Sequence, residues 1–315
     1  MGKNYFFAAG LYAAGALSLS AVAADVKLAT QQSASSVPTS TVGSPSMGYV
    51  VGPRALELRA ILGVPGAARF SDPMPLPPAT RSAEMAPGQA WALLIRASDA
   101  AAYLPASQVA QPLPGGVPTA WAFSPTGTRL ALWNRALGQM TLVSGLPGAP
   151  RLESTLQIPQ PDAFAIGDTG SLVYVTGGQI YTGSGQSLYQ SLQLGPVAFE
   201  ATRDAIVLFD GSNSSLLEID LSNPSPRLIA AGFGTPDHLF AASDQIFAGS
   251  SSGASVWTID YATGLIAARN VSVSRIVPCG IPGTMLVSYT SLGPAWLVNA
   301  QGVSFVPSAL TPADQ

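Results

Sequence analysis

The chain has 315 residues, of which 47% are hydrophobic and only 10% are charged, and its formal net charge is −3. Its charges are spread without runs, so there is no basic stripe of the kind that binds nucleic acid or anionic lipid. The 32 glycines and 27 prolines, among so many apolar residues, predict short strands joined by tight turns rather than a disordered chain.

The first 24 residues have the pattern of a secretory signal peptide. Lys3 precedes an apolar stretch at residues 5–19, and small residues follow as far as Ala23 and Ala24. The alternative is a membrane anchor, but the stretch is shorter than the roughly 20 residues that a spanning helix needs. We therefore expect cleavage near Ala23 or Ala24 and a secreted or periplasmic mature protein without a membrane span.

Residues 25–47 follow the predicted signal and are rich in Ser, Thr, Gln and Pro. They show no hydrophobic periodicity, which is typical of a flexible leader. Residues 48–315 are predicted to form a single domain.

A strand pattern recurs about every 40 residues through this domain. The clearest copy, at residues 121–132, has the sequence W-A-F-S-P-T-G-T-R-L-A-L, in which a turn separates two apolar runs. A later turn marker recurs at Asp220, Asp260 and Asn299, at intervals of 40 and 39 residues. Copies begin 35–41 residues apart, near Ala83, Ala122, Ala163, Ala198, Leu239 and Val277. This period is that of a β-propeller blade.

The six copies are preceded by a partial one. Residues 48–51 and 56–62 are expected to be the second and third strands of another blade, whose innermost strand would come from residues 26–30 or 308–315. A ring has to close because an open edge strand invites aggregation. We therefore predict an all-β propeller of four-stranded antiparallel blades, with seven blades favoured and six possible. The five tryptophans lie on predicted strands and are expected to pack between blades.

The F-S-P-T-G-T-R-L-A segment at residues 123–131 resembles the repeat core of WD40-like and TolB-type propellers. Residues 173–177 and 256–264 are similar to YVTN and quinoprotein-like propeller repeats. Thr126 stands where the first group has Asp, and the G-H and W-D dipeptides of true WD40 blades are absent. The resemblance implies a disc with a central channel that mostly binds partners.

Few residues suit catalysis or metal binding. His238 is the only histidine, and Cys279, the only cysteine, lies in an apolar segment and is expected to be a buried, inert thiol. Residues 249–253 have the G-x-S-x-G spelling of a nucleophile elbow, but no helix pattern follows, so we predict a hairpin. Residues 210–214 resemble part of a calcium loop and are also interpreted as a hairpin turn. The sequence thus predicts no catalytic, cofactor or metal site.

The remaining candidates are polar residues at or near predicted innermost strands, where several blades meet around the axis. We predict binding residues at Glu84, Asp162, Glu200, Asp237, His238 and Arg275. The leading hypothesis is a monomeric, non-catalytic scaffold that binds a protein or glycan of the cell envelope through loops on one face. The alternative is an extracellular polysaccharide hydrolase or lyase, with carboxylates such as Glu84 and Glu200 around the channel.

Overall fold

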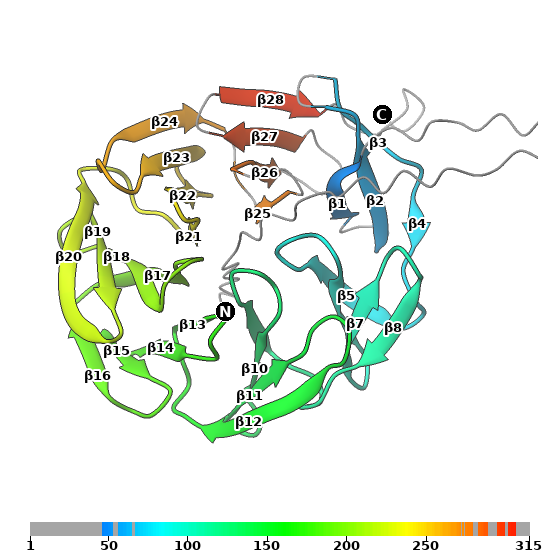
Figure 1. The fold of residues 1–315 in the computed structure, drawn as a ribbon, viewed down its shortest axis with the longest axis horizontal. Helices are drawn as coiled ribbons and strands as arrows, with labels where there is room; N and C mark the ends of the chain where they lie inside the picture. The colour runs from blue at the N-terminus through cyan, green and yellow to red at the C-terminus, as the bar shows by residue number, and fades with distance from the viewer. Residues whose placement is uncertain are drawn as a thin grey trace, which may run out of the picture.

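Seven small β-sheets stand in a ring around a central axis (Figure 1). The computed structural model describes residues 46–52, 56–64, 67–271, 273, 275–279, 283–288, 295–299 and 302–306. The colour passes once around the ring, so the first and last blades are neighbours. The predicted seven-bladed, all-β propeller with four-stranded antiparallel sheets is confirmed. Within the described ranges there is no helix long and apolar enough to cross a membrane.

Each blade takes consecutive strands, beginning with the innermost. Blades 1 to 3 contain β1 (Ser46–Gly52), β2 (Glu57–Leu62), β3 (Arg69–Phe70), β4 (Met74–Pro75); β5 (Thr80–Met85), β6 (Ala92–Arg96), β7 (Ala100–Leu104), β8 (Val109–Pro112); β9 (Ala120–Phe123), β10 (Leu130–Asn134), β11 (Gln139–Ser144), β12 (Arg151–Gln157). Blades 4 and 5 contain β13 (Ala163–Ile166), β14 (Leu172–Thr176), β15 (Gln179–Thr182), β16 (Ser187–Gln190); β17 (Leu194–Phe199), β18 (Ala205–Asp210), β19 (Ser215–Asp220), β20 (Asn223–Ala231). Blades 6 and 7 contain β21 (His238–Ala241), β22 (Gln245–Ser250), β23 (Ser255–Asp260), β24 (Ile266–Asn270); β25 (Arg275–Pro278), β26 (Met285–Ser288), β27 (Ala295–Asn299), β28 (Gly302–Val306).

The predicted S-P-T-G turn joins β9 to β10. The N–H of Ser124 donates to the carbonyl oxygen of Arg129 at 3.0 Å, and the N–H of Gly127 donates to that of Ser124 at 2.9 Å. Gly127 has a φ of 72°, which glycine adopts without steric cost. Thr126 donates its hydroxyl to the carboxylate of Asp168 in the next blade at 2.6 Å. The residue that departs from the resembled repeat therefore links two blades.

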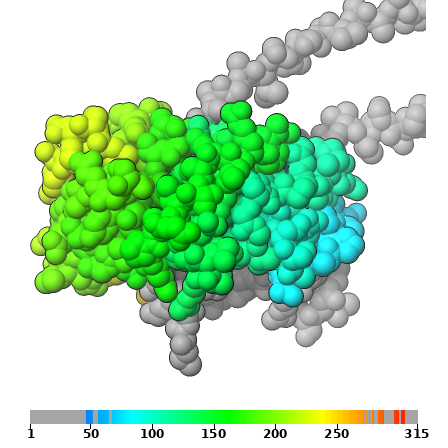
Figure 2. All heavy atoms as spheres, turned by 90° about the horizontal axis from the view of Figure 1, so that it is seen from below, coloured from blue at the N-terminus to red at the C-terminus, as the bar shows by residue number. Residues whose placement is uncertain are grey.

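The ring has two distinct faces because successive strands of each blade run antiparallel. We call the face where the innermost strands begin the strand-start face, and the face where they end the strand-end face. Loops between blades, and between the second and third strands of a blade, lie on the strand-start face. In the side view, blades 2 to 5 form one continuous outer wall between the two faces (Figure 2).

The first blade differs from its prediction. β1 is its innermost strand, pairs with β2 and contacts β5 of the next blade, so the prediction that residues 48–51 form a second strand is wrong. Along the other edge of β2 lie the short β3 and β4, separated at Pro73, which has no N–H to donate to a ladder. β1 begins at Ser46, inside the predicted leader. The predicted signal peptide and the segments 26–30 and 308–315 lie outside the described residues.

The ring closes by side-chain packing between blades 1 and 7. Met47 and Ile61 pack against Cys279, Leu286 and Leu297. Each sheet of the described structure comes from one continuous segment, and none combines strands from both ends of the chain. Cys279 is 2% exposed, which confirms the expected buried thiol.

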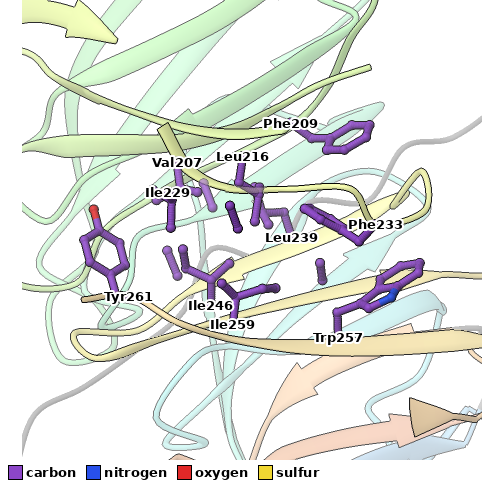
Figure 3. Packing of buried hydrophobic residues seen from close by; sticks show 14 residues of the cluster. Val207, Phe209, Leu216, Ile229, Phe233, Leu239, Ile246, Trp257, Ile259 and Tyr261 are labelled. Atoms are coloured by element: carbon purple, nitrogen blue, oxygen red, sulfur yellow. The ribbon is translucent and has the colours of Figure 1, made fainter. Parts of the chain in front are cut away.

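The hydrophobic core lies between neighbouring blades. Figure 3 shows the cluster between blades 5 and 6, with Phe233 and Trp257 at one end and Tyr261 at the other. Trp91 and Trp121 belong to the equivalent cluster between blades 2 and 3. For these three tryptophans, the expected packing between blades is confirmed.

Candidate functional site

Four of the six predicted binding residues lie on the strand-start face. Asp162 and Asp237 immediately precede β13 and β21, and His238 and Arg275 are the first residues of β21 and β25. The side chains of Asp237 and His238 are 38% and 19% exposed. Blades 4, 6 and 7 thus each contribute a polar residue to this face.

The other two predicted residues lie toward the strand-end face. Glu84 is the last residue but one of β5, and Glu200 directly follows β17. Both glutamates are 2% exposed. The six residues therefore form two groups at opposite ends of the innermost strands.

Asp162 and Asp237 hold equivalent positions in their blades. The carboxylate of Asp162 accepts the N–H of Gly177 at 3.1 Å, and that of Asp237 accepts the N–H of Ser251 at 3.1 Å. Thr119 makes the same contact in blade 3 with its hydroxyl oxygen, also at 3.1 Å. These side chains fasten the loop that enters a blade to the hairpin beside it.

His238 lies beside the G-x-S-x-G segment. Its Nε2 is 3.3 Å from Oγ of Ser251 and 3.5 Å from Oδ1 of Asp237. A serine triad needs the serine and the carboxylate on different imidazole nitrogens, whereas here both approach Nε2. The segment joins β22 to β23, so the predicted hairpin is confirmed.

Asp210 is the centre of a buried polar cluster on the strand-start face. Its carboxylate accepts hydrogen bonds from the hydroxyls of Tyr189 and Ser191 at 2.8 and 2.6 Å, the N–H of Ser212 at 3.0 Å and the amide of Asn213 at 3.2 Å. Burial opposes ionisation, but these bonds outweigh it and lower the pKa of Asp210. The supposed calcium-loop fragment is thus a turn. The described residues contain no group of three or more His, Cys, Asp or Glu placed to hold a metal ion.

Both buried glutamates bond to nearby side chains. Oε2 of Glu84 accepts the indole N–H of Trp121 in the next blade at 2.9 Å. The carboxylate of Glu200 accepts the N–H and hydroxyl of Thr202 at 3.0 and 2.8 Å, and lies 3.5 Å from Nε of Arg203. These carboxylates are engaged within the protein.

Glu200 is exceptional for its position in the blade. In blades 2 to 7, the residue after the innermost strand donates its N–H across the first hairpin at 2.8 to 3.1 Å. These residues are Ala86, Ser124, Gly167, Glu200, Ala242 and Cys279. Among these six described positions, blade 5 alone has a charged side chain. A buried charge is costly unless it is paired, and blade 5 supplies the partners.

Glu200 belongs to a group at the strand-end edge between blades 5 and 6 that we call the arginine cluster: Glu200, Arg203, Glu218, Arg227 and Tyr261. Nη2 of Arg203 is 2.8 Å from Oε1 of Glu218, and Arg227 pairs with the other oxygen of that carboxylate. The guanidinium carbons of both arginines lie 5.3 and 5.5 Å from the Tyr261 ring centre. The glutamate side chains are 0% and 6% exposed, whereas the arginines are 48% and 51% exposed. Negative charge is thus turned inward and positive charge outward.

Tyr261 connects the arginine cluster to the apolar core. Its ring occupies one end of the cluster in Figure 3. Burial raises the pKa of its hydroxyl, and the neighbouring Glu218 carboxylate raises it further. Tyr261 therefore stays neutral at physiological pH and acts as a packing surface for both guanidinium groups.

Sequence reasoning missed Glu218, Arg227 and Tyr261. In the next copy, 40 residues later, Thr258 and Ala267 stand in place of Glu218 and Arg227, and the same cross-strand pairing joins them. A search for charged residues at positions that are uncharged in another copy would have found this pair.

No protein-family model matches the chain, and no curated protein matches it. Among solved structures it is similar to a streptogramin B lyase, with a TM-score of 0.54 and 11% identity over 81% of this chain and 88% of the other. It is also similar to U3-55K, with a TM-score of 0.52 and 9% identity over 72% and 80% of the two chains. A virginiamycin B lyase from Staphylococcus aureus gives a TM-score of 0.48 and 12% identity over 86% and 87%. Such low identities show a shared fold alone.

Proposed function

We propose that this chain is a secreted or periplasmic, non-catalytic scaffold that binds a protein or glycan of the cell envelope through the strand-start face. The propeller fold supports this proposal because loops from several blades share that face. The observation that carries it is the division of the predicted site residues between the two ends of the innermost strands.

That division weighs against the alternative, a polysaccharide hydrolase or lyase. Glycoside hydrolysis needs two carboxylates on either side of one bond, within about 10 Å of each other. Glu84 and Glu200 lie toward the strand-end face, are 2% exposed, and already bond to other side chains. Asp162 and Asp237 lie at the other face and serve as turn acceptors. This arrangement supports recognition by loops over cleavage at the axis.

The test is site-specific photo-crosslinking in an envelope extract. A photoreactive residue replaces Ser251 or Leu192, which is 99% exposed in the loop between blades 4 and 5. The control position is Leu152, 55% exposed on the outer strand β12. We expect one discrete protein adduct from both loop positions and none from the control. If the ligand is a glycan, the wild-type chain binds a glycan array and His238→Ala weakens that binding.

Two results would contradict the scaffold: adducts that form equally from all three positions, or the absence of both adducts and array binding. Release of reducing ends from envelope polysaccharide, lost in Glu200→Gln, would support the enzyme instead. Export is tested separately by N-terminal sequencing, which we expect to begin at Ala24 or Asp25.

A further inference from the structure

The two arginines of the arginine cluster differ in how far their charge is used within the protein. Arg203 contacts Glu218 and Glu200. Hydrogen bonds from Ser222 lower the pKa of Asp220, and the charge of Arg203 lowers it further, so Asp220 also lies within reach of Arg203. Arg203 is therefore shared among three carboxylates.

Arg227 has fewer partners. Among the described residues, its Nε and Nη2 pair with Glu218 and its guanidinium lies over the Tyr261 ring. A guanidinium group carries five N–H donors, so those on Nη1 remain available. The side chain is 51% exposed, which places this donor group at the surface.

An exposed apolar surface adjoins this guanidinium. Ile266 lies directly opposite Ile259, a member of the core between blades 5 and 6, so both are on the sheet face turned toward blade 5. The turn before it touches blade 5, because a Cβ on Gly264 would meet the carbonyl oxygen of Ile229 at 2.3 Å. Leu265 and Ile266 are 72% and 36% exposed. Cationic and aliphatic groups thus lie together at this junction.

Packing of the propeller does not require charged residues here. Blade 6 fills the positions of Glu218 and Arg227 with Thr258 and Ala267. Replacing a buried ion pair by apolar residues is often neutral or stabilising, so the pair is weak evidence of a purely structural role.

We propose that Arg227, Leu265 and Ile266 bind a protein segment in which a carboxylate side chain is flanked by aliphatic residues. The planar guanidinium can hold a carboxylate through parallel N–H···O bonds, and Glu218 and Tyr261 fix its orientation beforehand. Aliphatic side chains of the partner cover Leu265 and Ile266. This surface lies at the strand-end face and is independent of the strand-start face of the proposed function.

The test uses the full chain and two blocked peptides, acetyl-Leu-Asp-Leu-amide and its uncharged twin acetyl-Leu-Asn-Leu-amide. Binding is measured by NMR titration. We expect the acidic peptide to bind with a Kd of about 1 mM, and Arg227→Gln to weaken it about tenfold or more. The twin should bind the wild-type chain about tenfold more weakly. The matched control is Arg269→Gln, on outer strand β24, which should leave the affinity unchanged.

Circular dichroism first establishes that each variant is folded. If Arg227→Gln does not fold, Ile266→Ser tests the apolar half of the surface and should weaken the acidic peptide severalfold. Equal binding of the two peptides, or equal affinity of the folded variant and wild type, would overturn the proposal. So would complete displacement of the acidic peptide by an equal concentration of inorganic phosphate, which would indicate a site for any small anion.

Discussion

The carboxyl group of Asp210 has a lowered pKa although the residue is only 1% exposed. Two of its donors, Tyr189 and Ser191, come from blade 4 and the loop that leaves it, whereas Ser212 and Asn213 belong to its own hairpin. Charge-assisted hydrogen bonds are stronger than neutral ones. One ionised side chain therefore joins two blades at the strand-start face.

We expect Asp210→Asn to lower the free energy of unfolding by about 1–3 kcal/mol at about pH 7. A lowered pKa means that the ionised carboxylate stabilises the fold above the unfolded-state pKa of about 3.9. That contribution is lost as the pH falls through the lower pKa of the folded state, so wild type and variant converge in acid. Urea unfolding at a series of pH values measures the difference, and a gap that does not change with pH would refute this account. Asp162→Asn, at an exposed turn, serves as the control.

At the scale of strands and turns, the repeat could be predicted because its chemistry is local. The turn marker forms as expected: the carboxylate of Asp260 accepts the N–H groups of Ala262 and Thr263 at 3.1 and 2.7 Å, and Asn299 accepts that of Gly302 at 2.9 Å. Such turns are closed by residues two or three positions apart. Their signal survives in every copy that keeps the spacing.

The arginine cluster could not be predicted in this way. Glu200 and Tyr261 lie 61 residues apart and meet only because blades 5 and 6 pack against each other. The first blade was misassigned for a related reason. Residues 48–51 are apolar enough for a second strand, and only their contact with β5 shows that they are innermost. Contacts between blades leave no short-range pattern.

Gly264 shows how a turn and its neighbouring blade constrain each other. It has a φ of 69°, and a Cβ there would lie 2.3 Å from the carbonyl oxygen of Ile229. Gly185, in the corresponding turn of blade 4, has a φ of 86° and nothing within 4 Å of such a Cβ. We expect Gly185→Ala to cost about 1 kcal/mol for backbone conformation alone. Gly264→Ala should cost about 1–3 kcal/mol more because blade 5 has to move.

Thermal or urea unfolding of both variants measures this difference. Equal destabilisation by the two substitutions would show that the contact with Ile229 yields without cost.

For the whole molecule, the decisive contact is the closure between blades 7 and 1, because no sheet of the described structure is shared between the chain ends. Gln89, in the first hairpin of blade 2, reaches across this closure. Its Oε1 accepts the N–H of Tyr49 in blade 1 at 2.7 Å, and its Nε2 donates to the carbonyl oxygen of Pro278 in blade 7 at 2.7 Å. The residue is 6% exposed and has a φ of 61°, unusual for a residue other than glycine. One buried side chain thus holds three blades together.

We expect Gln89→Ala to destabilise the ring by about 2 kcal/mol or more, because it leaves two buried backbone groups without their partner. Gln108→Ala is the matched control, since Gln108 has a φ of 57° but an exposed side chain, so the backbone effect is the same. Hydrogen exchange should accelerate in β1 and β25 before it does in β13 and β17, because the closure opens first. Uniform loss of protection in all blades would show instead that the ring unfolds as one unit and that Gln89 does not hold the closure.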